Sequence, residues 1–301
     1  MNLNALKTEQ RNENTFTIDE LDSYGIISKI NDEDQTVAIS VKNELEDIAK
    51  AVDLIEKSLS SDGRLIYIGA GTSGRLAILD SAECPPTYGF DSNRIISLIA
   101  GGEAAFIGAI EGVEDSKDEG VEDLKRLNLS SKDVVVGLAA SGRTPYVIEA
   151  LKYSNEVGAG TISIACNKNT KIGKLGKVNI EVEVGSEAIT GSTRMKSGTA
   201  QKMILNMLST AVMVKLGKVY SNLMVNVGSF NEKLIERQKN IVMQATGASR
   251  EQATAILNET DRDCKLSIFM ILSDENLESA KEILSKNDWN IKKALKNLNI
   301  K

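Results

Sequence analysis

The sequence of 301 residues contains no histidine. This absence excludes Ser-His-Asp and Cys-His catalysis, histidine-ligated zinc and every reaction that needs an imidazole acid or base. The three cysteines lie far apart, so we expect neither a disulfide framework nor a Cys-x-x-Cys metal site. We interpret Cys84 and Cys166 as small buried hydrophobic residues rather than nucleophiles. Acid–base chemistry must then come from Glu, Asp, Lys, Tyr or Cys.

The sequence also lacks an excess of positive charge and any long apolar run. Lys and Arg number 36 against 42 Asp and Glu, a formal net charge of −6, which argues against a broad nucleic-acid-binding face. Residues 1–20 are polar, and no apolar segment approaches the length of a membrane span. We therefore expect a cytoplasmic protein with neither nucleic acid nor membrane as a partner. Aromatic residues make up only 4%, so the core must be mainly aliphatic.

Short apolar runs alternate with helical patterns through the middle of the chain. Four runs of strand length lie at residues 65–68, 95–99, 134–138 and 161–165. Near-continuous apolar strands separated by helices are typical of a parallel sheet that is covered on both faces. Apolar and polar residues alternate over 178–184, which predicts a strand nearer the sheet edge. The predicted fold class is therefore α/β, with a doubly wound parallel sheet.

Helical patterns flank this region on both sides. Apolar residues at spacings of three and four predict one long amphipathic helix from Val37 to Leu59. Near the other end, Gly247 and Ser249 predict a helix stop followed by a new N-cap. Beyond them we find only helical patterns, and we expect Trp289 to anchor the core of this tail.

The predicted division has three parts. Residues 1–35 form an N-terminal arm, of which residues 1–30 carry little periodicity. Residues 36–245 form the α/β domain, which is also the predicted catalytic domain, and residues 246–301 form a small all-helical subdomain.

Three loops rich in Gly, Ser and Thr follow predicted strands, and ligands bind outside the carboxyl ends of strands in open α/β sheets. The loops run from Gly69 to Gly74, from Ser141 to Pro145 and from Gly185 to Thr199. Hydroxyl groups and backbone N–H groups at helix N-termini suit a phosphate. The candidate substrate- and phosphate-binding residues are Gly71, Thr72, Ser73, Gly74, Ser141, Gly142, Arg143, Thr144, Ser192, Thr193 and Lys196.

Other interpretations of these loops exist. The first loop matches Gly-x-Gly-x-x-Gly, but a dinucleotide site needs an acidic residue about 20 positions further on. The nearest candidate, Glu103, comes 103 − 74 = 29 residues after Gly74. Ser141 and Thr144 could merely cap a helix that begins at Pro145. Three such loops on neighbouring strands favour a phosphorylated polyol.

The loops also carry a family resemblance. The stretch from Gly69 to Thr87, together with 141–145 and 192–196, resembles the N-acetylmuramic acid 6-phosphate etherases. The segments 6–12 and 30–37 are similar to that family too, so the resemblance covers essentially the whole chain. It implies a sugar isomerase (SIS) domain that binds phosphosugars, kinship with the glucokinase regulatory protein, and a ubiquitin-associated-type helical bundle after Gly247.

The resemblance further implies a reaction. The D-lactyl ether of N-acetylmuramic acid 6-phosphate would be cleaved to N-acetylglucosamine 6-phosphate and D-lactate, a step in cell-wall amino sugar recycling. No metal and no organic cofactor are expected, and the resemblance favours a homodimer whose pocket borrows residues across the interface. Two alternatives stay open: a non-catalytic phosphosugar sensor, and an aldose–ketose isomerase.

Two glutamates match the catalytic positions of the family. Glu83 directly precedes Cys84-Pro85-Pro86, where we expect an apolar corner, and Glu114 lies in a break between two helical stretches. If the sugar ring opens, the C1 aldehyde acidifies the C2 proton, so that one base and one acid suffice. We assign C2 proton removal to Glu114, and protonation of lactate and activation of water to Glu83. The exchange of these roles stays open, and Glu111 and Asp115 are rivals for the role of Glu114.

Overall fold

The computed structural model describes residues 6–228 and 232–300. The chain divides into two compact units, each of which is described by itself. The first comprises residues 1–81 and 93–209, and the second comprises residues 82–92 and 210–301. The predicted domain limits at 35/36 and 245/246 are not the limits of these units, and they stay predictions.

The first unit is built on one parallel sheet. Its strands in spatial order are β2 (Ile95–Ile99), β1 (Leu65–Gly69), β3 (Val134–Leu138), β4 (Gly160–Ala165) and β5 (Val178–Glu181). Every neighbouring pair is parallel, which confirms the predicted doubly wound sheet, and β5 lies at an edge. The chain leaves β1 toward one edge and leaves β3 toward the other. The point where the strand order reverses therefore lies between β1 and β3.

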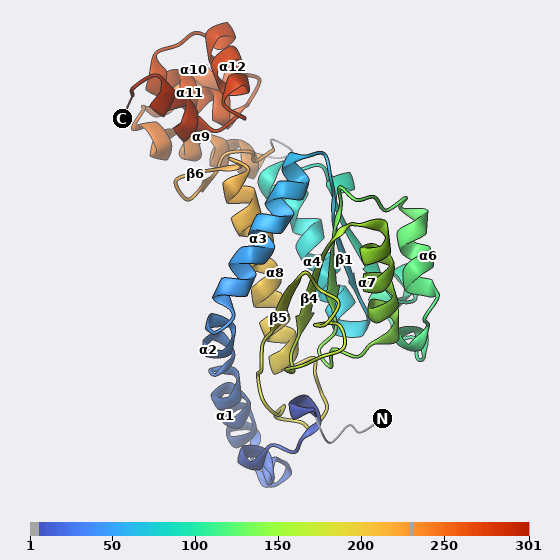
Figure 1. The fold of residues 1–301 in the computed structure, drawn as a ribbon. Helices are drawn as coiled ribbons and strands as arrows, with labels where there is room; N and C mark the ends of the chain where they lie inside the picture. The colour runs from blue at the N-terminus through green and yellow to red at the C-terminus, as the bar shows by residue number, and fades with distance from the viewer. Residues whose placement is uncertain (1–5, 229–231, 301) are drawn as a thin grey trace. The chain divides into compact units, whose positions relative to one another are not determined.

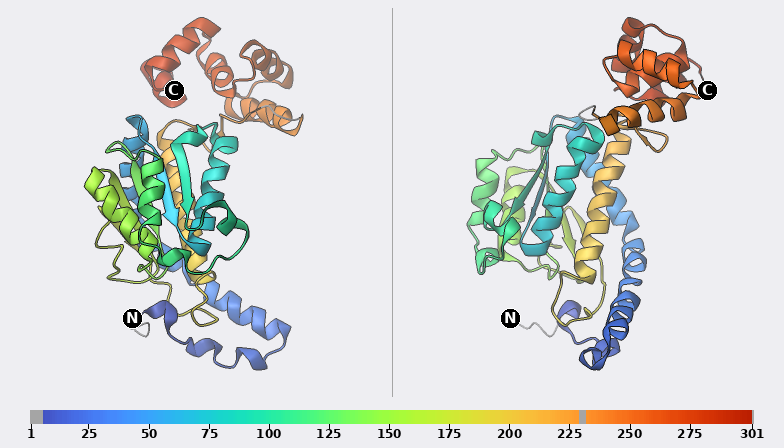
Figure 2. Two further views of the ribbon diagram at one scale, coloured as in Figure 1. Left: turned by 90° about the vertical axis from the view of Figure 1, so that its right-hand side faces the viewer. Right: turned by 180° about the vertical axis from the view of Figure 1, so that it is seen from behind.

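Helices cover both faces of this sheet (Figures 1 and 2). One face carries α6 (Glu119–Arg126) and α7 (Pro145–Val157), and the other carries α3 (Leu45–Ser60), α4 (Gly71–Tyr88) and α8 (Lys196–Lys215). Side chains alternate across the sheet, as the pleat requires. Ile66 and Ile68 pack with Val147 and Leu151 of α7. Between them Tyr67 points the opposite way, and its hydroxyl donates to Asp80 of α4 at 3.1 Å. A short helix, α5 (Gly102–Ile107), follows β2.

The N-terminal segment contains more regular structure than the sequence predicts. From residue 6 onward, the short 3-10 helices η2 (Lys7–Glu9), η3 (Glu13–Thr15) and η4 (Ile18–Glu20) precede α1 (Ser23–Asp34). Helix α1 begins at an aspartate N-cap, since Asp22 accepts a hydrogen bond from the Gly25 N–H at 2.8 Å. Periodicity missed α1 because its exposed positions include several apolar side chains, such as Tyr24 and Ile27.

The predicted single helix from Val37 to Leu59 is wrong in one respect. Two helices, α2 (Val37–Lys42) and α3, replace it, with a break at Asn43 and Glu44. The backbone N–H groups of these two residues bond three residues back, to Ser40 and Val41, so the helix tightens and stops. The predicted apolar stripe is nevertheless buried at Val37, Val41, Ile48, Val52, Ile55 and Leu59.

Besides the ends of α4 and α8, the described part of the second unit contains a small hairpin and a series of helices: β6 (Val219–Tyr220), β7 (Leu223–Met224), α9 (Glu232–Thr246), α10 (Arg250–Glu259), α11 (Cys264–Ser273), α12 (Leu277–Lys286) and α13 (Ile291–Asn297). Ser249 caps α10 as predicted, and Asp263, Asn276 and Asn290 cap the next three helices. No helix in the described part of the chain is both long and apolar enough to cross a membrane.

The predicted role of Trp289 in this unit is wrong. Its side chain is 40% exposed, whereas Phe269 is fully buried. Phe269 lies on α11, seven of whose ten residues are buried, and this helix forms the centre of the unit. Trp289 has a φ of 54° in the turn before α13, where the chain follows the surface of the unit.

Candidate active site

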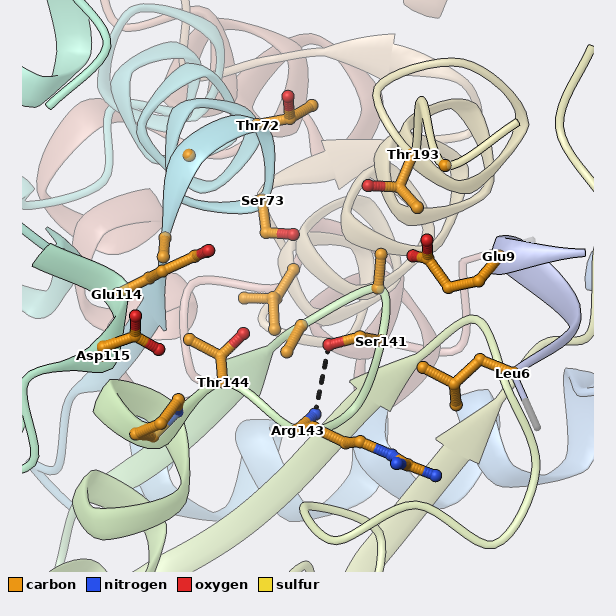
Figure 3. A pocket seen from close by; sticks show the side chains of 17 residues that line it. Leu6, Glu9, Thr72, Ser73, Glu114, Asp115, Ser141, Arg143, Thr144 and Thr193 are labelled. Atoms are coloured by element: carbon orange, nitrogen blue, oxygen red, sulfur yellow. Dashed lines mark hydrogen bonds between the residues drawn. The ribbon is translucent and has the colours of Figure 1, made fainter. Parts of the chain in front are cut away.

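A pocket of about 450 Å³ lies at the carboxyl ends of β1 and β3. Five segments meet there: the turns after β1 and β3, a turn at residues 114–115, the N-terminal arm and the loop before α8 (Figure 3). Its lining consists of Leu6, Glu9, Ala70, Gly71, Thr72, Ser73, Glu114, Asp115, Leu138, Ala139, Ala140, Ser141, Arg143, Thr144, Pro145, Gly191 and Thr193. Since the strand order reverses between β1 and β3, this is the place where an open α/β sheet binds its ligand.

The turn after β1 brings the start of α4 against the sheet. A Cβ at Gly74 would lie 2.6 Å from Ile99 Cγ1, so only glycine permits this approach. Gly74 thus supports the turn but does not line the pocket. Gly71, Thr72 and Ser73 do line it, at the N-terminus of α4, where backbone N–H groups lack helical acceptors and the helix dipole is positive.

The loop after β3 contributes the second set of hydroxyl groups. Gly142 has a φ of 66°, and its carbonyl accepts from the backbone N–H groups of Lys171 and Ile172, both at 3.1 Å. It therefore shapes the loop from outside the pocket lining. Ser141 Oγ accepts from the Arg143 N–H at 3.3 Å (Figure 3), which leaves the hydroxyl hydrogen free to donate. Thr144 makes no side-chain capping bond to α7, so its hydroxyl is also available.

The loop before α8 is only partly in the pocket. Gly191 and Thr193 line it, whereas Ser192 and Lys196 do not. The ammonium of Lys196 instead donates to Glu33 Oε2 at 2.5 Å, and both side chains are about nine-tenths buried. Burial alone raises the pKa of Glu33, but hydrogen bonds from Lys196 and Asn14 outweigh it and lower the pKa below its usual value.

Acidic side chains enter the pocket from the short 3-10 helix η6 (Val113–Asp115). Glu114 and Asp115 both line the pocket, on the same side of it in Figure 3. The break between helical stretches predicted around Glu114 is confirmed. Glu111, its other rival, is not part of the lining. The choice between Glu114 and Asp115 as the base therefore stays open.

The other predicted catalytic residue, Glu83, is not among the lining residues. It lies on α4 in the segment 82–92, which belongs to the second compact unit, and its side chain is exposed. The expected apolar corner is not present, because Pro85 and Pro86 continue α4 as far as Tyr88 instead of turning the chain back over Glu83.

Two lining residues of the N-terminal arm, Leu6 and Glu9, were not predicted as site residues. The only sequence signal for them was the resemblance of the segment 6–12 to the etherase family. The cysteines are structural, as predicted: Cys84 and Cys166 are buried, and burial raises the pKa of the Cys166 thiol to about 12. Among the described residues, no group of three or more Cys, Asp and Glu side chains is placed to hold a metal ion.

The fold and the pocket define an SIS-type protein. Residues 47–155 match the glucokinase regulatory protein N-terminal SIS domain, and residues 114–211 match the SIS domain. The fold is similar to that of a protein of E. coli CFT073 solved in complex with A5P, with a TM-score of 0.50 and 16% identity over 67% of this chain and 97% of that one. At that identity the likeness concerns the fold alone.

Curated relatives identify the family. The chain is 56% identical over 298 residues to the N-acetylmuramic acid 6-phosphate etherase of Clostridium botulinum (strain Okra / Type B1), covering 99% of both chains. It is 55% identical over 293 residues to the enzyme of that name from Bacillus mycoides (strain KBAB4), covering 97% of this chain and all of the relative. The chain belongs to the N-acetylmuramic acid 6-phosphate etherase family, as the sequence motifs predict.

Proposed function

We propose that this protein cleaves the D-lactyl ether of N-acetylmuramic acid 6-phosphate to give N-acetylglucosamine 6-phosphate and D-lactate. The observation that carries the proposal is one pocket with two kinds of lining: hydroxyl groups at two helix N-termini, and carboxyl groups from η6. The first suits a phosphate and the second suits proton transfer at a sugar carbon. The names of the full-length relatives support the same substrate.

The phosphate is held by the turns after β1 and β3 in this proposal. Thr72 and Ser73 stand at the start of α4, and Ser141 and Thr144 stand just before α7. Donors from two helix N-termini then converge on one anion, and both helix dipoles favour its negative charge. Arg143 lines the same pocket, and its guanidinium adds positive charge on the side away from Glu114 (Figure 3).

The reaction then needs one base and one acid. Ring opening exposes the C1 aldehyde, and Glu114 removes the proton from C2 that this aldehyde acidifies. The electron pair left at C2 forms the C2–C3 double bond while the C3–O bond breaks, and Glu83 gives its proton to the lactyl oxygen. Glu83 next takes a proton from water, the oxygen of which adds to C3, and the proton held by Glu114 returns to C2. Asp115 is the alternative base.

Glu83 can serve this pocket from a second copy of the chain, and we include a homodimer in the proposal. Its support is that the side chain of Glu83 is exposed, so that a second copy of the chain can reach it. The three cysteines are free and buried, as in proteins of a reducing compartment, and the proposed site of action is the cytoplasm.

Release of D-lactate from N-acetylmuramic acid 6-phosphate by the purified protein tests the proposal. We expect D-lactate and N-acetylglucosamine 6-phosphate in equal amounts. A phosphosugar sensor would bind the substrate and release nothing. An aldose–ketose isomerase would convert the sugar and leave the ether intact. Either result would overturn the proposed reaction.

A further inference from the structure

The N-terminal arm is fixed to the carboxyl-end edge of the sheet by buried hydrogen bonds. The side-chain amide of Asn167, just beyond β4, donates to Thr8 Oγ1 at 3.0 Å and to the Ala140 carbonyl at 3.1 Å. Thr8 is fully buried, and Asn167 is 2% exposed. Since both partners are shielded from water, breaking this hydrogen bond would leave buried polar groups unpaired. The contact therefore holds the arm in one position on the sheet edge.

Two further contacts secure the arm beyond Glu9. The Asn12 side-chain amide donates to the Ser186 carbonyl at 3.2 Å, and Thr15 Oγ1 donates to the Ala188 carbonyl at 2.9 Å. Both acceptors lie in the loop that also supplies Thr193 to the pocket. The backbone at Glu9 is therefore held between two anchored points of the arm, and this places its side chain at the pocket.

The carboxyl group of Glu9 has no partner, unlike those of two buried glutamates, Glu33 and Glu44. Glu33 is bound by Lys196, and Glu44 accepts from Lys168 at 2.6 Å. Glu9 makes no side-chain hydrogen bond and no ion pair with any residue that the structure describes, although it lines the pocket. Its Oε2 lies against Gly191, where an added Cβ would come within 3.2 Å of it.

The negative charge of Glu9 limits which groups of a ligand it can bind in the pocket. A carboxylate repels a phosphate and a lactyl carboxylate, and it attracts hydroxyl and amide N–H donors. Glu9 lies across the pocket from Glu114 and Asp115 (Figure 3), so it is not part of the η6 acid pair. A phosphosugar that spans this pocket would turn neutral donor groups toward Glu9.

We propose that Glu9 is a substrate-binding residue that accepts hydrogen bonds from hydroxyl or amide N–H groups of the sugar. The arm thereby orients the sugar while the turns after β1 and β3 hold its phosphate. The identity of the sugar rests on the proposed function; the role of Glu9 as an acceptor for neutral donors rests on the geometry of the arm.

Binding of two probes to Glu9 variants tests this role. We expect Glu9→Ala to weaken the binding of N-acetylglucosamine 6-phosphate about 10- to 100-fold, because a hydrogen bond to a charged acceptor is lost. Inorganic phosphate should bind Glu9→Ala as tightly as it binds the wild-type protein, or more tightly, since a nearby negative charge is gone. Glu9→Gln keeps a hydrogen-bond acceptor, so its affinity for N-acetylglucosamine 6-phosphate should lie between those of the wild-type protein and Glu9→Ala. Glu13→Ala, on the same arm but outside the pocket lining, is the matched control and should bind both probes normally.

Two results would overturn the inference. One is binding of N-acetylglucosamine 6-phosphate to Glu9→Ala within twofold of the wild-type value. The other is a parallel loss of phosphate binding, which would indicate that Glu9 only maintains the pocket. Isothermal titration calorimetry gives both affinities without turnover, so the outcome is independent of lactate release. A protein that released no lactate but lost sugar-phosphate binding in Glu9→Ala would contradict the proposed reaction and keep the role of Glu9.

Discussion

Lys196 and Glu33 form a buried ion pair that joins the start of α8 to α1, with Nζ and Oε2 2.5 Å apart. The sequence predicts that Lys196 contacts the substrate. In the structure its ammonium group donates a hydrogen bond to Glu33, a residue of the N-terminal segment. Glu33 also accepts from the Asn14 side chain at 2.8 Å. The pair therefore fixes the segment that carries Glu9, and substitutions should act on stability before they act on binding.

We predict that Lys196→Met destabilises the protein by about 3–5 kcal/mol, because it leaves the Glu33 carboxylate buried without its cation. The double variant Lys196→Met, Glu33→Gln should recover most of this loss. Urea unfolding of the two variants and the wild type measures the effect. A single variant as stable as the wild type would contradict the assignment of the pair as structural.

The hydroxyl group of Ser73 has a buried partner within the protein, and this gives a prediction that separates stability from binding. Its hydroxyl donates to Gln201 Oε1 at 2.8 Å, while Gln201 Nε2 has no partner within the described ranges. We expect Ser73→Ala to cost about 1–3 kcal/mol, since it leaves the whole Gln201 amide unpaired. Adding Gln201→Met should restore stability. Phosphate binding by the double variant should stay near the wild-type value, because the hydroxyl hydrogen of Ser73 is bound to Gln201 and the backbone N–H of residue 73 remains. Weak phosphate binding by the stable double variant would show that the hydroxyl group contacts the anion.

Asp80 makes stability depend on pH. Burial raises the pKa of its carboxyl group to about 6, and hydrogen bonds from Ser209 and Tyr67 oppose this rise only in part. Between the unfolded value, about 3.9, and about 6 the native state holds a proton that the unfolded state has lost. This contribution to stability is therefore complete below about pH 4, falls as the pH rises toward 6 and is lost above it.

We predict that Asp80→Asn gains about 2 kcal/mol relative to the wild type when the pH changes from 4.5 to 7.5. Urea titrations at both pH values measure the difference, and Asp34→Asn, an exposed site on α1, is the control. A constant difference between Asp80→Asn and the wild type at the two pH values would show that Asp80 has the same pKa in the folded and unfolded states.

Local patterns predicted the sheet and its loops well. The apolar runs at β1 and β3 and the Gly-rich turns that follow them are short-range signals, and the parallel topology then brings those turns together. The caps at Ser249 and the stop at Gly247 are equally local. These features can be predicted without knowing which residues pack against them.

Features that depend on a distant partner were not predictable in the same way. Glu9 reaches the pocket because Thr8 binds Asn167, which lies 159 residues further along the chain. The ammonium group of Lys196 donates to Glu33, which lies 163 residues earlier in the chain. Both placements depend on a hydrogen bond between polar side chains far apart in the sequence, and apolar periodicity does not indicate such pairs.

The most direct test of the account is exchange of the C2 hydrogen of N-acetylmuramic acid 6-phosphate in deuterated water, followed by NMR together with lactate release. We predict that Glu114→Ala loses both activities, because the base is gone. Glu83→Ala should still exchange the C2 hydrogen while lactate release falls, since only the acid is missing. Lactate release at the wild-type rate by Glu83→Ala, or continued C2 exchange by Glu114→Ala, would contradict the assigned roles.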